Sequence, residues 1–149
     1  MEKKLCTSTL LRRLNQTSDI RTFLSANRDS LTSPALSEHL IQLARGRGEI
    51  PERIILRAGI ERTFGHQLFN GTRKPSRDKV VQLALGFGLN ESETQRLLQI
   101  AGKSQLYPRI ERDAVILFAL YKKLSFMDTQ SLLEELGLVI LGGITRDEQ

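Results

Sequence analysis

The stretch Gly59-Ile-Glu-Arg-Thr-Phe-Gly-His-Gln-Leu-Phe-Asn-Gly71 organises the rest of the chain. On a helix that begins near Glu61, an arc of about 100° carries polar side chains, and the opposite side is apolar, with Ile60, Phe64 and Leu68. We therefore expect one face to pack and the other to offer hydrogen bonds. Because Gly59 ends a shorter helical run over residues 51–58, the pattern is typical of two helices joined by a tight turn.

Residues 34–102 resemble the lambda-repressor/Cro-like (XRE-type) helix-turn-helix family of transcriptional regulators. The resemblance rests on the stretch above and on the Thr-Arg-Lys-Pro-Ser76 segment that follows it without a gap. It implies an all-α, five-helix domain that places the helix near 61–70 in the major groove of DNA. By the same resemblance, Arg62 and Thr63 fall at base-reading positions, Arg73 at a base-contacting loop position and Asn70 at a backbone-contacting position.

The chemistry of these side chains suits such roles. Arg62 can donate a bidentate pair to guanine, Thr63 offers a hydroxyl and a methyl group, and His66 lies one turn further along the same face. Basic side chains also gather around the start of the next helix, where free backbone N–H groups favour phosphate. We therefore expect the bases to be read by Arg62, Thr63, His66 and Arg73, and the DNA backbone to be contacted by Asn70, Lys74, Arg77 and Lys79. The alternative for this face is an ordinary solvated surface.

Three positions depart from the family pattern. Pro51 stands where the family commonly has a glutamine that touches the DNA backbone, and proline has no N–H donor. Glu61 is an acidic residue at the start of the DNA-facing helix, where it favours the helix dipole but repels phosphate. Where the two helices pack, the family typically has a small residue on the first helix and a branched residue on the second. Here the two sizes are swapped, because Ile55 is predicted to pack on Gly65, and the total side-chain volume is conserved.

Composition and residue spacing limit which other classes of function are possible. Of 149 residues, 40% are apolar and 26% charged, and apolar spacing of helical period recurs along the chain, so we expect an all-α protein. A single cysteine, Cys6, excludes an internal disulfide, and His39 and His66 lack the spacing of metal ligands. We therefore expect no catalytic residue, cofactor or metal. Because the sequence has no apolar run of membrane-spanning length and no signal peptide, we expect a cytoplasmic protein.

The chain divides into a helical N-terminal arm (1–33), the helix-turn-helix domain (34–103), a C-terminal hairpin (104–141) and a loose tail (142–149). The hairpin is predicted because residues 112–137 repeat residues 77–102 at an offset of 35, including Arg-Asp and Thr-Gln pairs in register. Convergence is the alternative, since leucine, alanine and a final glycine recur in many helix pairs. We expect the repeat to dock on its first copy, with Phe118 and Leu136 among its inward residues and 138–141 free at the edge.

The overall charge is +5, and its distribution is uneven along the chain. The arm and the helix-turn-helix domain are basic, whereas residues 104–149 are net acidic. This distribution is compatible with a DNA-facing surface at the front of the chain. The sequence therefore predicts a regulator that binds double-stranded DNA as a homodimer. The alternative is a non-catalytic adaptor that uses the same fold to bind a protein, as the partner of a signalling or toxin component, with the arm or the C-terminal hairpin as a contact surface.

Overall fold

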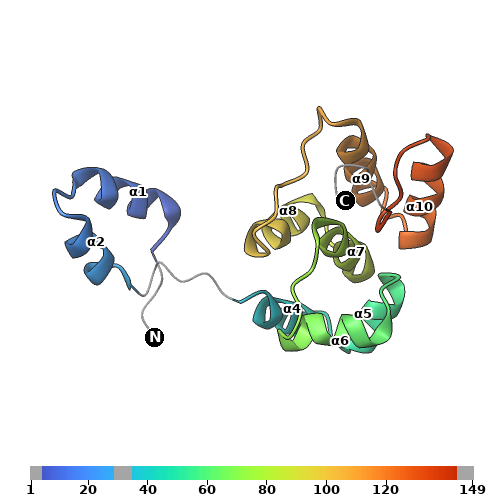
Figure 1. Ribbon diagram of the computed structural model, residues 1–149, viewed down its shortest axis with the longest axis horizontal. Coiled ribbons are helices and arrows are strands. Elements are labelled where there is room, and N and C mark those ends of the chain that lie inside the picture. The colour runs from blue at the N-terminus through green and yellow to red at the C-terminus, as the bar shows by residue number, and fades with distance from the viewer. Residues whose placement is uncertain (1–4, 29–34, 144–149) are drawn as a thin grey trace. The chain divides into compact units, whose positions relative to one another are not determined.

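The computed structural model describes residues 5–28 and 35–143, and over these residues it is all-helical, so the predicted all-α class is confirmed. The helices form two compact units, Met1–Pro34 and Ala35–Gln149 (Figure 1). In the described part of the chain, no helix is long and apolar enough to cross a membrane.

The first unit is a pair of short helices, α1 (Thr7–Gln16) and α2 (Ile20–Ala26). The Asp19 carboxylate caps α2 by accepting a hydrogen bond from the backbone N–H of Arg21. Phe23 is buried, and Arg13 joins the two helices through a 2.9 Å hydrogen bond to the buried side chain of Asn27. Several large apolar residues of this unit stay exposed, namely Leu11, Leu14, Ile20 and Leu24.

The second unit contains seven helices in its described residues: α4 (Leu36–Gly46), α5 (Pro51–Arg57), α6 (Arg62–Asn70), α7 (Arg77–Phe87), α8 (Glu91–Ile100), α9 (Glu111–Tyr121) and α10 (Phe126–Glu135). Helix α7 lies between α4–α6 on one side and α9–α10 on the other (Figure 1). All its residues from Val80 to Phe87 are buried. The core of the unit is therefore built around α7.

The helix starts follow local capping chemistry. Ser76 caps α7, and Asn90 and Glu93 form a reciprocal capping box on α8. Both caps are predicted by the sequence, which has a serine before the first of these helices and an asparagine with a glutamate three residues later at the start of the second. For the first helix of the domain, the sequence predicts an N-cap at Ser33 followed by Pro34 at the first helical position. Both residues lie outside the described ones, and α4 begins at Leu36.

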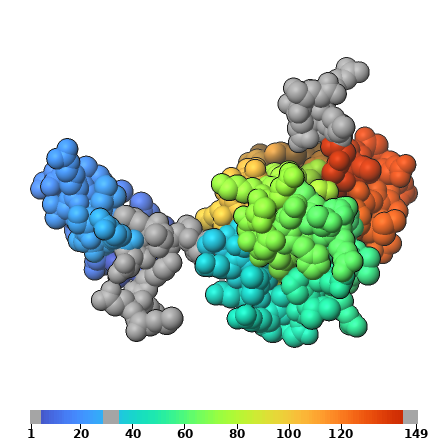
Figure 2. All heavy atoms as spheres, turned by 60° about the horizontal axis from the view of Figure 1, so that its bottom comes forward, coloured from blue at the N-terminus to red at the C-terminus, as the bar shows by residue number. Residues whose placement is uncertain are grey.

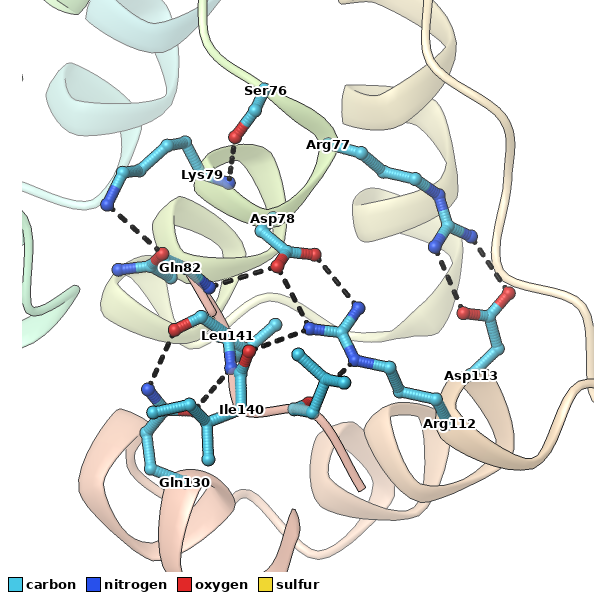
Figure 3. Close-up of polar contacts among 12 residues, drawn as sticks. Ser76, Arg77, Asp78, Lys79, Gln82, Arg112, Asp113, Gln130, Ile140 and Leu141 are labelled. Carbon is cyan, nitrogen blue, oxygen red and sulfur yellow. Dashed lines mark hydrogen bonds and ion pairs between the residues drawn. The ribbon is translucent and has the colours of Figure 1, made fainter. Parts of the chain in front are cut away.

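The hairpin α9–α10 is joined to α7 by two crossed ion pairs, each between the arginine of one Arg-Asp sequence and the aspartate of the other (Figure 3). Arg77 binds Asp113 with both terminal nitrogens, at 3.0 and 2.8 Å, and Arg112 binds Asp78 at 2.9 Å on both sides. Such bidentate pairs are short, strong and directional. We call this set the crossed ion pairs, and it fixes how the two hairpins meet.

Backbone contacts around the crossed ion pairs repeat with the same offset of 35 residues. Arg77 also donates to the carbonyl oxygens of residues 104 and 105, and Arg112 donates to those of residues 139 and 140. The side chain of Gln95 holds both backbone groups of Leu106, as that of Gln130 holds both of Leu141. Because each contact of one hairpin has its counterpart in the other, the two are related by an approximate twofold rotation.

Three expectations about the second hairpin are wrong. Phe118 and Leu136, predicted to face inward, have exposed fractions of 47% and 52%. In the segment 138–141, predicted to lie free at the edge, Val139 and Ile140 are exposed, but Leu141 is 3% exposed, because Gln130 binds its backbone and draws it against α10. The two hairpins therefore dock through their helix starts and the segments that follow them, and part of the apolar side of α9 and α10 stays exposed.

Candidate nucleic-acid interface

The packing of α5 against α6 orients the polar face that the sequence singled out. Gly59 joins the two helices with a φ of +68°, a conformation that glycine adopts readily. A Cβ atom on Gly65 would lie 2.4 Å from a methyl group of Ile55, so the predicted contact between these two residues is confirmed. Ile60 and Leu68 are buried beside it. With this side of α6 packed, its other side is open to solvent.

The open side of α6 carries the predicted base-reading residues of the helix. Arg62, Thr63 and His66 are exposed, and so is Asn70 at the end of the helix. Gly71 follows in the left-handed conformation with a φ of +83° and ends the helix. The structure therefore places these four polar side chains on solvent-exposed positions of one nine-residue helix.

The loop after α6 adds basic residues to the same surface. Arg73 and Lys74 are exposed, and Pro75 behind them is buried. The side chain of Asn70 accepts a 2.9 Å hydrogen bond from the backbone N–H of Thr72, which orders the first turn of the loop. Figure 2 shows the surfaces of α5 and α6 and of the segment after them on one continuous face.

Two carboxylates limit what the start of α6 can bind. Glu61 caps the helix, and its side chain accepts hydrogen bonds from the backbone N–H groups of Phe64 and Thr63 at 2.8 and 2.9 Å. These bonds, the one from Phe64 first, lower the pKa of Glu61, so its carboxylate is ionised at neutral pH. The free N–H groups that attract phosphate at other helix starts are therefore already occupied here.

The second carboxylate is that of Glu52 on α5, a residue that the sequence analysis did not single out. It forms an ion pair of 2.9 Å with the side chain of Arg62, and both partners are largely exposed. Exposed ion pairs contribute little free energy, about 0 to 1 kcal/mol. Arg62 can therefore leave Glu52 for a nucleic-acid acceptor at small cost. The available signal in the sequence was the position of Glu52, a carboxylate in the first turn of the helix that precedes Arg62.

Of the three basic residues expected at the DNA backbone, two have partners within the protein. Arg77 is held in the crossed ion pairs and by two backbone carbonyl groups, so its guanidinium is engaged in docking the hairpins. Lys79 is partly buried and donates to the side chain of Gln82 at 3.4 Å. The third, Lys74, is exposed, and so is Asn70. The exposed basic side chains of the expected site are thus Arg62, Arg73 and Lys74.

The described residues offer little else for ligand chemistry. Among them, no group of three or more His, Cys, Asp or Glu side chains could hold a metal ion. Cys6 is exposed, and hydrogen bonds with Ser8 and Thr9 lower its pKa to about 7, but no histidine shares these contacts. A groove of about 420 Å³ between α5, α7, α9 and α10 is mainly apolar, with Leu56, Phe126 and Met127 in its wall.

Comparisons with models of known families, with curated proteins and with solved structures give no match.

Proposed function

We propose that the protein is a sequence-specific, DNA-binding transcriptional regulator in which α5 and α6 act as a helix-turn-helix. One observation carries the proposal: α6 packs one side on α5 and exposes Arg62, Thr63 and His66 on the other, next to the exposed Arg73 and Lys74. Side chains of this kind on a protruding helix suit base edges in the major groove. In this proposal helices α4–α8 form the five-helix domain that the family resemblance implies.

The division of labour follows from the chemistry of each side chain. Arg62, once released from Glu52, can donate two hydrogen bonds to one guanine, and Thr63 and His66 can contact neighbouring base edges. Arg73 contacts a base from the loop after α6, whereas Lys74 and Asn70 contact the DNA backbone. One helix reads only a few base pairs, so we infer that a homodimer binds an inverted repeat with half-sites about 34 Å apart.

The test starts by selecting bound duplexes from a random DNA library with the full chain, since the operator is not known. On the selected duplex, Arg62→Ala should weaken binding by about 1 to 3 kcal/mol and relax the preference at one base position. Lys74→Ala should instead weaken selected and random duplexes alike and reduce the slope of affinity against salt by about one.

Lys103→Ala is the matched control for Lys74→Ala, because Lys103 is an exposed lysine after α8. It should leave both affinity and salt slope unchanged. Equal losses for Arg62→Ala on selected and random DNA would contradict base reading by that residue. If the library yields no enriched sequence and neither variant changes affinity, the proposed function is wrong.

A second candidate is a non-catalytic adaptor that uses this fold to bind a protein. The two carboxylates at the start of α6 favour it, because Glu61 occupies the helix N–H groups and Glu52 pairs with Arg62. Replacing both with Gln separates the candidates. A DNA-binding α6 should bind duplexes more tightly once two negative charges are gone, whereas unchanged, weak DNA binding would favour the adaptor.

A further inference from the structure

The approximate twofold relation between the hairpins gives each residue of α7 a counterpart on α9. On α7, Leu83 is fully buried and Gly86 lies so close to α5 that an added Cβ would sit 2.7 Å from the carbonyl oxygen of Ile54. Their counterparts on α9 are Phe118 and Tyr121, with exposed fractions of 47% and 63%. The face of α9 that corresponds to the face covered by α5 in the first hairpin therefore has no covering helix among the described residues.

The residues along this face form one stripe. Glu111, Val115, Phe118 and Lys122 follow at spacings of four, three and four, which places them on one side of a helix. The Nζ atom of Lys122 lies 5.9 Å from the centre of the Phe118 ring, so the two side chains do share a side. Val115 is half-buried, and Glu111 and Lys122 are exposed. The stripe thus has an apolar middle, an acidic start and a basic end.

The order of these four residues is self-complementary. When a second α9 runs antiparallel across the stripe, Glu111 of each chain meets Lys122 of the other, and Val115 meets Phe118. A parallel arrangement would instead place like charges opposite each other, which is unfavourable. The charge pattern therefore selects a second copy of this chain, in one direction, rather than a partner of a single charge sign.

We propose that α9 is a homodimer interface, in which two copies pack their stripes antiparallel about a twofold axis that passes near Ile116 and Leu117. The apolar middle supplies most of the affinity, and the two Glu111–Lys122 pairs at the ends fix direction and register. Tyr121 flanks the stripe, and its hydroxyl group donates a 2.5 Å hydrogen bond to Glu91, which ties this end of α9 to α8. The proposal deepens the homodimer of the proposed function by naming the surface that joins the two copies, and this surface needs no DNA to form.

The experiment is sedimentation equilibrium of the full chain without DNA, at concentrations up to about 0.5 mM. Phe118→Asp should raise the dimer dissociation constant at least about tenfold, because a charge replaces the central apolar contact. Leu56→Asp is the matched control, an apolar side chain on α5 that is 79% exposed, and it should leave the dissociation constant unchanged. A monomeric wild type, or equal effects of the two substitutions, would overturn the proposal.

Charge reversal tests the direction of packing without touching the apolar middle. Glu111→Lys and Lys122→Glu should each raise the dissociation constant about twofold to tenfold, and the double variant should return it to within about twofold of the wild type. Additive losses in the double variant would refute the antiparallel register. Arg62→Ala should dimerise normally, so a failure of DNA binding and a failure of this interface are distinguishable.

Discussion

The hairpins α7–α8 and α9–α10 share contacts but differ in what surrounds them. Both begin with an Arg-Asp sequence that pairs with the other hairpin, and both bind the backbone of a later leucine through a glutamine. In the first hairpin, α7 is buried along its length by α5 and the C-terminal hairpin. In the second, α9 shows solvent a face with Phe118 and Tyr121.

This difference separates two roles of a repeated sequence. Of the features that the copies share, the Arg-Asp sequence makes the contact between the copies, and the glutamine holds the segment that follows its own hairpin. The residues that differ, such as Gly86 against Tyr121, adapt each copy to its surroundings: glycine allows α5 to approach closely, and tyrosine suits an open surface. Comparing equivalent substitutions in the two hairpins therefore measures what the surroundings contribute.

The largest effect is expected at the aspartates of the crossed ion pairs. Asp113 is 2% exposed and receives hydrogen bonds from Arg77 and from the backbone N–H of Tyr107, whereas its counterpart Asp78 is partly exposed. Asp113→Ala should lower the free energy of unfolding by about 3 to 5 kcal/mol, because it leaves the partly buried guanidinium of Arg77 and the backbone N–H of Tyr107 without their carboxylate acceptor. Asp78→Ala should cost less, about 1 to 3 kcal/mol.

Urea denaturation followed by circular dichroism measures both losses. Glu134→Ala, at an exposed position of α10, serves as the control and should change stability by less than about 0.5 kcal/mol. Equal losses for the two aspartates would show that the deeper burial of Asp113 adds nothing to the cost of breaking its ion pair.

The next prediction concerns two equivalent helix positions, one on α7 that faces α5 and one on α9 that faces solvent. Gly86→Ala should cost about 1 to 3 kcal/mol, because the new methyl group would lie 2.7 Å from the carbonyl oxygen of Ile54 and 2.8 Å from the Cβ of Ala58. Tyr121→Ala, at the equivalent position of α9, should change stability by less than about 1 kcal/mol. Thermal unfolding at low protein concentration checks this, and a tolerated Gly86→Ala would mean that α5 can shift away from α7.

Much of the fold could be predicted because its determinants are local. The caps at Ser76 and Asn90, the helix near 61–70 and the contact of Gly65 with Ile55 all follow from spacing and side-chain size within a few turns. These features depend on neighbours in the sequence, and periodicity reports such neighbours well.

What could not be predicted depends on distant partners. Arg77 was placed with the DNA-contacting residues because it lies beside other basic residues at a helix start, and its carboxylate partner is 36 residues away. The in-register repetition of Arg-Asp was the available signal, since two copies of a charged pair can exchange partners. Phe118 of α9 was expected to face inward because periodicity reveals an apolar face without showing what covers it.

A smaller effect concerns the turn inside each hairpin. In both copies one residue of the turn after the first helix is left-handed, Gly88 with a φ of +73° and Lys123 with a φ of +55°. A side chain in this conformation costs about 1 to 2 kcal/mol, so Gly88→Ala should destabilise the protein by roughly that amount. Lys123→Gly should stabilise it by up to about 1 kcal/mol. Urea denaturation of both variants checks the pair, and a loss of stability in Lys123→Gly would show that its 3.3 Å hydrogen bond to Gly88 matters more than backbone strain.

The smallest effect that we expect is the pH dependence of the stability that the ion pair of Asp78 and Arg112 contributes. Partial burial acts to raise the pKa of Asp78, but hydrogen bonds from Arg112 and from the backbone N–H of Gly142, with the nearby positive charges, outweigh it and lower the pKa. A carboxylate whose folded-state pKa is lowered stabilises the protein above its unfolded pKa of about 4 and loses this contribution as the pH falls through the folded value.

The measurement is the difference in unfolding free energy between the wild type and Asp78→Asn, taken from pH 7 to pH 3, so that other carboxylates largely cancel. The difference should stay constant down to about pH 5 and shrink below about pH 4. Because Asp78 and Arg112 are partly exposed, salt should also reduce it. A difference that stays flat to pH 3, or that grows in acid, would mean that Asp78 contributes through packing and backbone hydrogen bonds and that its charge is dispensable for docking the second hairpin.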